Sequence, residues 1–103
     1  MPRQHIPTLF QITVAGGEGS VSLHIDGDAI GLSMIPPGSG TYDLEVLRID
    51  PNDATREHGR TGRAGQSGNC VIQEEWQAYP NTKVKVSNAV DDGIYYGEIS
   101  YKG

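Results

Sequence analysis

The chain has 103 residues, 36% of them hydrophobic, and a formal net charge of −5 at pH 7. This length accommodates one domain with its own core, so residues 1–103 are predicted to form a single domain. The acidic balance argues against nucleic acid as the main partner, and no stretch is long and apolar enough for a membrane span. Cys70 is the sole cysteine, which excludes an intramolecular disulfide and a cysteine zinc site.

Alternating apolar and polar residues predict four β-strands in the first half of the chain. They cover approximately residues 9–14, 21–25, 30–34 and 42–49, with turn-forming stretches between them. In the fourth strand the alternation slips by one residue at Val46 and Leu47. Either a β-bulge at this point or the passage of the strand from one sheet to another explains the slip.

The middle of the chain lacks such a pattern. Residues 51–69 contain four glycines and three arginines without periodicity. They are predicted to form one long Gly/Arg loop, and Met1–Pro7 an N-terminal arm. Strand character resumes from Val71 to Tyr79, where Glu74 interrupts an apolar face and favours an edge position or only partial burial; a short helix over residues 73–78 is the alternative.

The end of the chain, from Thr82 to Gly103, contains two strand-like runs separated by Asp91-Asp92-Gly93. This pattern predicts a β-hairpin. With about seven strands and no convincing helix, the sequence predicts an all-β protein. Its expected form is an antiparallel β-sandwich, immunoglobulin-like or jelly-roll-like, with one long loop.

No pattern of titratable residues indicates catalysis. Asp26-Gly27-Asp28 lacks the further acids of a calcium loop, and His5, His24 and His58 are not at metal-ligand spacing. No metal, cofactor or enzymatic activity is therefore expected. A small hydrolase would require a pocket in which His24 or His58 meets an Asp or Glu.

Two groups of residues are candidates for binding. Arginines on a flexible segment can recognise carboxylates, which makes Arg56, Arg60 and Arg63 candidate protein-interaction residues. Exposed aromatic rings suit a carbohydrate or protein contact, and the candidates are Trp76, Tyr79, Tyr95 and Tyr96. Trp76 is expected in the core. Adjacent strand residues face opposite ways, so one of Tyr95 and Tyr96 is expected to be exposed.

The C-terminal runs, Val-Lys-Val-Ser-Asn at residues 84–88 and Asp-Gly-Ile-Tyr-Tyr-Gly-Glu-Ile-Ser-Tyr at residues 92–101, carry a resemblance. With the acidic, glycine-rich composition and a start that lacks the apolar run of a signal peptide, the chain resembles small all-β accessory proteins of tailed bacteriophage, the decoration or minor capsid class. The resemblance implies a non-enzymatic structural protein, made in the host cytoplasm and located in the virion.

Such a protein would bind the capsid shell or another virion component as a homo-oligomer. The arginine loop and the N-terminal arm would make the contacts. The alternative is a carbohydrate-binding β-sandwich module that uses a strip of Trp76, Tyr79 and one of Tyr95 or Tyr96.

Overall fold

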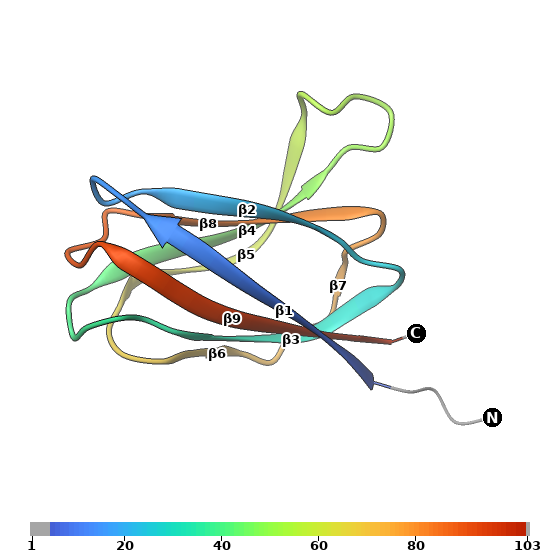
Figure 1. The fold of residues 1–103 in the computed structure, drawn as a ribbon. Coiled ribbons are helices and arrows are strands. Elements are labelled where there is room, and N and C mark those ends of the chain that lie inside the picture. Colours follow the sequence, from blue (N-terminus) through green and yellow to red (C-terminus); the bar gives the residue numbers. More distant parts are fainter. Residues whose placement is uncertain (1–4, 103) are drawn as a thin grey trace.

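Nine β-strands make up the structure, a computed structural model that describes residues 5–102 (Figure 1). The strands are β1 (His5–Val14), β2 (Gly19–His24), β3 (Asp28–Ile35), β4 (Tyr42–Ile49), β5 (Glu57–Gln66), β6 (Cys70–Ile72), β7 (Trp76–Gln77), β8 (Asn81–Ser87) and β9 (Gly93–Lys102). The described residues contain no helix. All strand pairs among the described residues are antiparallel, and the predicted all-β sandwich is confirmed.

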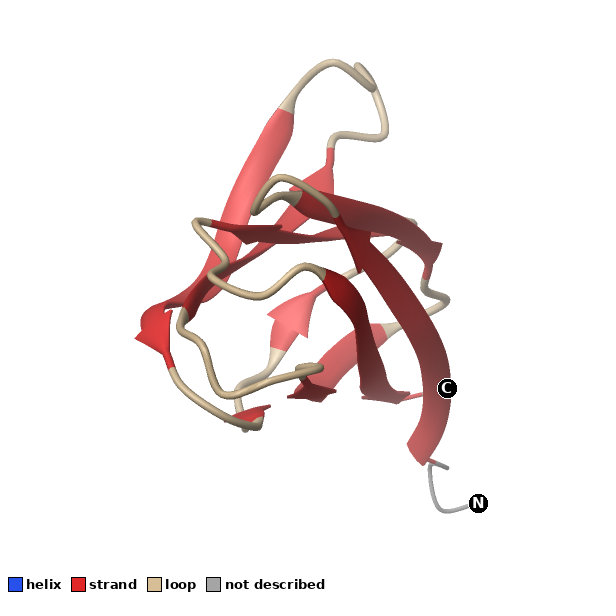
Figure 2. Cartoon of the chain, turned by 60° about the vertical axis from the view of Figure 1, so that its left-hand side comes forward, coloured by secondary structure: helices blue, strands red, loops and turns tan. Residues whose placement is uncertain are grey.

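The strands form two packed sheets (Figure 2). One has the order β1-β9-β3-β6, with β7 also on β3; the other has the order β2-β8-β4-β5. The pairs are nested along the chain, because β4 pairs with β5, β3 with β6, β2 with β8 and β1 with β9. A two-stranded ribbon of this kind, rolled up so that β9 meets β3 and β8 meets β4, has jelly-roll order. Here β6 and β7 together take the place of one strand.

The core lies between the two sheets and follows the predicted alternation. Phe10, Ile12 and Val14 of β1 are buried, and the apolar positions of β3, β4, β8 and β9 face them. The buried set also includes Leu32, Met34, Tyr42, Leu44, Val46, Val84, Val86, Tyr95 and Ile99. Each large apolar side chain that leaves water contributes about 1.5–3 kcal/mol before the entropy of ordering is subtracted.

The predicted C-terminal hairpin is wrong. β8 and β9 lie in different sheets, and the segment between them crosses from one to the other. Its backbone bonds to other loops: the Val90 N–H donates to the carbonyl of Thr41, and the Ala89 N–H donates to that of Gly17. A turn signal shows where a chain reverses, but it does not show whether the two strands pair with each other.

The acidic pair in this connection joins three loops at one end of the sandwich. The Asp92 carboxylate accepts hydrogen bonds from the N–H groups of Gly16 and Gly17, at 3.1 and 3.0 Å. The Asp91 carboxylate accepts one from the Gly40 N–H at 2.7 Å. These carboxylates satisfy loop backbone donors, which explains two acids at this point of the chain.

The predicted Gly/Arg loop over residues 51–69 is also wrong for most of its length. Residues 57–66 form β5, and the connection between β4 and β5 is limited to residues 50–56. β5 pairs only with β4, so it is an edge strand. An edge strand needs less apolar alternation than a central one, and polar or glycine residues suit it. For this reason β5 shows no alternation of apolar and polar residues in the sequence.

A β-bulge lies opposite Val46 and Leu47, close to the predicted position, but its extra residue is on the neighbouring strand and not on β4. Val46 pairs with Thr61 and Leu47 pairs with Gly59, so the extra residue is Arg60 on β5. The pairing of β4 with β8 continues without interruption across the same point, so β4 does not change sheets.

The remaining boundaries differ in detail. Residues 1–4 of the predicted arm lie outside the described residues, and residues 5–7 belong to β1. The stretch from Val71 to Tyr79 is divided into the short edge strands β6 and β7, with no helix over residues 73–78. The edge position inferred from Glu74 is confirmed. β5 and this division account for nine strands instead of seven.

Candidate interaction surface on the β4–β5 hairpin

The β4–β5 hairpin belongs to the four-stranded sheet, and its end projects from the rest of the molecule (Figures 1 and 2). Aspartates order its tip, residues 50–56. Asp50 accepts a hydrogen bond from the Asn52 N–H at 2.7 Å and lies 3.0 Å from Nε2 of His58. Asp53 accepts from the hydroxyl of Thr55 at 2.6 Å and pairs with Arg56 at 3.4 Å.

These contacts favour the ionised carboxylates. The hydrogen bond from His58 lowers the pKa of Asp50 below its usual value, and the hydroxyl and N–H of Thr55 lower the pKa of Asp53. The tip is therefore a compact turn, held by its own side chains, that carries charge of both signs.

The three candidate arginines occupy different environments, so they do not form the predicted flexible cluster. Arg56 is in the tip, with 76% of its side chain exposed. Arg60 is exposed at the bulge of β5, and no hydrogen bond or ion pair links it to another described residue. Arg63 is half-buried and bonded to Glu74. Of the three, Arg60 alone is exposed without a partner inside the described chain.

Arg63 has a structural role. Its Nη2 lies 3.0 Å from Oε1 of Glu74, and the hydroxyl of Thr61 donates to Oε2 of the same carboxylate at 2.8 Å. Glu74 lies between β6 and β7, so these bonds join the edges of the two sheets. The Thr61 hydroxyl and then the Arg63 guanidinium lower the pKa of Glu74.

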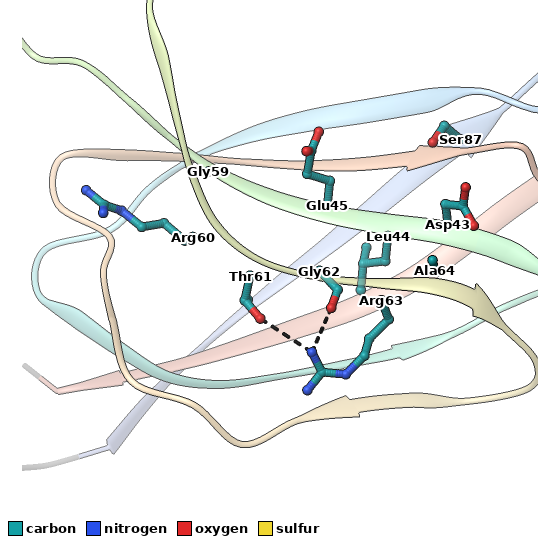
Figure 3. Close-up of a pocket in the computed structure, with 10 residues that line it drawn as sticks. All are labelled: Asp43, Leu44, Glu45, Gly59, Arg60, Thr61, Gly62, Arg63, Ala64 and Ser87. Carbon is teal, nitrogen blue, oxygen red and sulfur yellow. Dashed lines mark hydrogen bonds between the residues drawn. The ribbon is translucent and has the colours of Figure 1, made fainter.

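Residues of β4 and β5, together with Ser87, line a shallow hollow of about 520 Å³, and Figure 3 shows their side chains. In that view the side chains of Glu45 and Arg63 extend to opposite sides of the ribbon, and Arg60 extends away from Arg63. Gly59 and Gly62 also line the hollow. A Cβ on Gly62 would lie 2.8 Å from the carbonyl oxygen of Leu44, so glycine permits the close approach of β5 to β4 here.

The second edge of β5 has no neighbouring strand among the described residues. Backbone N–H and C=O groups on such an edge can pair with an added strand. The exposed Arg60 next to this edge offers a charged contact to the same partner. The arrangement therefore suits recognition of an extended polypeptide, and it does not assemble a nucleophile and a base.

The four aromatic candidates do not form a strip. Trp76 and Tyr95 are buried, with 6% and 0% exposure, while Tyr79 and Tyr96 are exposed. The ring of Tyr79 contacts that of His24 edge-on, with centroids 6.3 Å apart, near the end of β2. Tyr96 lies on the outer face of the other sheet, opposite Gln11 and Ile35. The predicted core position of Trp76 and the opposite orientations of Tyr95 and Tyr96 are confirmed.

Each of the two described histidine rings meets an aspartate. His24 lies 2.8 Å from Asp26, and His58 lies 3.0 Å from Asp50. Both histidines are exposed, and neither pair lines the hollow of Figure 3. Cys70 is buried, and desolvation raises the pKa of its thiol.

Within residues 5–102, no group of three or more His, Cys, Asp or Glu side chains is placed to hold a metal ion. The same part of the chain has no helix suited to crossing a membrane.

Comparison with known proteins gives a partial similarity over part of the chain. No protein family matches the sequence. A stretch of 58 residues is 31% identical to ribosomal protein L11 methyltransferase of Caldicellulosiruptor saccharolyticus, and it covers 56% of this chain. The chain spans 19% of the length of that relative. This similarity shows neither a shared family nor a shared activity.

Proposed function

We propose that the protein is a non-enzymatic structural protein that binds a larger protein assembly, namely the shell or another component of a virus particle. The observation that carries this proposal is the free edge of β5 on the projecting β4–β5 hairpin, beside the exposed and unpaired Arg60. Strand addition to such an edge supplies main-chain hydrogen bonds, and the arginine adds selectivity for a carboxylate.

The fold supports the same proposal by analogy. Jelly rolls occur in viral capsid domains and in lectins, so the architecture is compatible with attachment. The resemblance of the C-terminal strands to decoration proteins favours the virus particle between these settings. A capsid lattice would place many symmetric copies, so that a modest contact per copy is sufficient.

The charges indicate which arginine to test. Arg63 is already bonded to Glu74, whereas Arg60 has no competing partner among the described residues. A carboxylate of the bound partner would therefore pair with Arg60 without first breaking an internal ion pair. Loss of such a pair acts on affinity and leaves the fold intact.

The experiment is incorporation of Arg60→Glu protein into purified particles, measured by gel densitometry. We expect incorporation to fall about tenfold, with an unchanged thermal unfolding midpoint. The matched control is Lys85→Glu, which makes the same charge change on β8, away from the free edge. Equal incorporation of the Arg60→Glu and wild-type proteins would refute the role of the hairpin.

A carbohydrate-binding module is the second candidate, because the ring of Tyr96 is 52% exposed and jelly rolls are also a lectin architecture. Trp76 and Tyr95 are buried and cannot stack on a sugar, so Tyr79 and Tyr96 are the aromatic residues to test. Binding to a glycan array that is lost in the Tyr96→Ala protein would favour this function over the structural one.

A further inference from the structure

The outer face of the five-stranded sheet carries a second unusual surface. Besides Val71 of β6, four large apolar side chains are exposed there, which we call the Tyr96 patch: Leu9 (76%), Ile35 (56%), Ile94 (39%) and Tyr96 (52%). They come from β1, β3 and β9, three neighbouring strands. Tyr96 pairs with Ile35 on one side and with Gln11 on the other, while Leu9 pairs with Glu98. The register therefore gathers side chains distant in sequence into one patch.

The surface of the Tyr96 patch is not flat. A hollow of about 420 Å³ is lined by Leu9, Gln11 and Tyr96 toward β1, and another of about 170 Å³ is lined by Leu9, Ile35 and Tyr96 toward β3. Gly97 lines both. The Tyr96 ring thus stands between two hollows that apolar side chains can fill, and packed pockets around an aromatic anchor are typical of protein interfaces.

Charge is scarce in and around the patch. Glu98 lines the smaller hollow next to Leu9, Ser33 and Ile35, and it is the one charged residue among the residues lining either hollow. No described cation pairs with Glu98; Lys102, four residues further along the same strand, is bonded to Glu75 at 2.8 Å. A half-buried carboxylate without a cation, inside an apolar patch, complements a basic side chain.

We propose that the Tyr96 patch binds a partner protein segment that presents an arginine or lysine between apolar residues. The cation would meet the Glu98 carboxylate while its aliphatic stem lies along the Tyr96 ring, a cation–π arrangement. Apolar neighbours of that basic residue would fill the two hollows. This proposal is independent of the β4–β5 hairpin, because the two surfaces lie on different sheets.

The chemistry of the patch disfavours two other occupants. In a face-to-face pair of two copies, the Glu98 carboxylates would add like charge to an apolar interface, which is unfavourable. A glycan requires an open ring face, but Leu9 and Ile35 are exposed on either side of Tyr96 and interrupt the platform. A basic, apolar polypeptide meets neither obstacle.

The test is selection of displayed random dodecapeptides on the immobilised protein, followed by fluorescence anisotropy with the selected peptides. We expect enrichment of peptides with an Arg or Lys between apolar residues. Their affinity should fall about tenfold or more in Tyr96→Ser and in Glu98→Lys proteins. The matched control, Glu45→Lys on the other sheet, should bind like the wild type, and thermal melts should show all three variants folded.

Three outcomes would overturn the proposal. The first is no enrichment of basic, apolar peptides, or binding that survives both patch substitutions. The second is a dimer in sedimentation velocity that the Tyr96→Ser substitution dissociates, because a second copy would then cover the patch. The third is binding to an oligosaccharide array that is lost in the Tyr96→Ser protein.

Discussion

The outer faces of the two sheets differ in how their charges are used. On the four-stranded sheet, several charged side chains are bonded to one another or to loops: Lys83 lies 3.2 Å from Glu57, and Asp43 accepts from Asn88 at 2.8 Å. Arg60 at the edge of this sheet is an exception, because it has no partner among the described residues. On the five-stranded sheet, the Tyr96 patch is apolar and its one carboxylate, Glu98, has no cation. The inner faces of the two sheets, by contrast, are alike, because both present apolar side chains to the core. Function is therefore expected where the outer faces depart from a fully paired polar surface.

The largest expected effect comes from the floor of the Tyr96 patch. A side chain on Gly97 would overlap the ring of Phe10, which packs against the inner side of that glycine. Gly97→Val should therefore destabilise the protein by about 3 kcal/mol in urea unfolding. Glu98→Gln, one residue along and outward-facing, should change stability by less than about 0.5 kcal/mol. Similar midpoints for the two variants would contradict the assignment of inner and outer faces.

A second comparison sets an inner tyrosine against an outer one. Tyr42 is fully buried and its hydroxyl donates to the carbonyl of Gly68 at 2.7 Å, so Tyr42→Phe should cost about 1 kcal/mol. Tyr96→Phe should cost nothing measurable in the same unfolding experiment, because Tyr96 is exposed. Equal costs would show that the two hydroxyls share one environment.

Because Tyr42 is buried, the stability of the protein should also be sensitive to alkaline pH. Burial, followed by the nearby Cys70 and Tyr95, raises the pKa of Tyr42 from 10.0 to about 12. A raised pKa means that this stabilising contribution is complete below pH 10.0 and is lost as the pH rises toward about 12. The Tyr42→Phe protein should therefore lose less stability than the wild type over that range in urea melts. If the free energies of unfolding of the two proteins fall in parallel over this pH range, ionisation of Tyr42 is not the cause of the loss.

On β5, the two arginines should separate stability from binding. Arg63→Ala removes the bond to Glu74 that joins the sheets and should cost about 0.5 kcal/mol, the usual range for a partly exposed pair. Arg60→Ala should leave the free energy of unfolding unchanged. If Arg60→Ala is the more destabilising of the two in urea melts, the assignment of roles is reversed.

The smallest expected effect is on the stability of the protein at acidic pH. The pKa of Glu74 is lowered from 4.5 by Thr61 and Arg63, so its stabilising contribution is present above that pH and is lost as the pH falls through the lower folded value. Urea melts across this range should show a shallower acid loss for Glu74→Gln than for the wild type. An unchanged slope would mean that the carboxylate gains nothing from its partners on β5.

Alternation predicted which side chains are buried, but it did not predict which strands are neighbours. Ile12 and Val84 were assigned correctly because a buried face imposes period two. Alternation carries no information about which strands pair. The turn between β8 and β9 therefore predicts a hairpin, although the two strands lie in different sheets. β5 was missed because an edge strand tolerates glycine and arginine.

The candidate sites show the same division. The adjacency of Tyr95 and Tyr96 predicts that one of them is exposed, but not which one. The neighbours of the exposed Tyr96, Leu9 and Ile35, come from strands far away in the chain. The partner of Arg63 is likewise determined by packing, because Glu74 lies between β6 and β7 at the edge of the opposite sheet. Contacts of this kind depend on the rolled topology, which no local pattern encodes.

The central claim, that the free edge of β5 is the attachment edge, is tested most directly by hydrogen–deuterium exchange of the protein alone and within purified particles. If this edge binds the particle, amides of residues 57–66 should exchange at least about tenfold more slowly in the particle, while those of the central strand β9 should be unchanged. Equal exchange of residues 57–66 in the two states would contradict it.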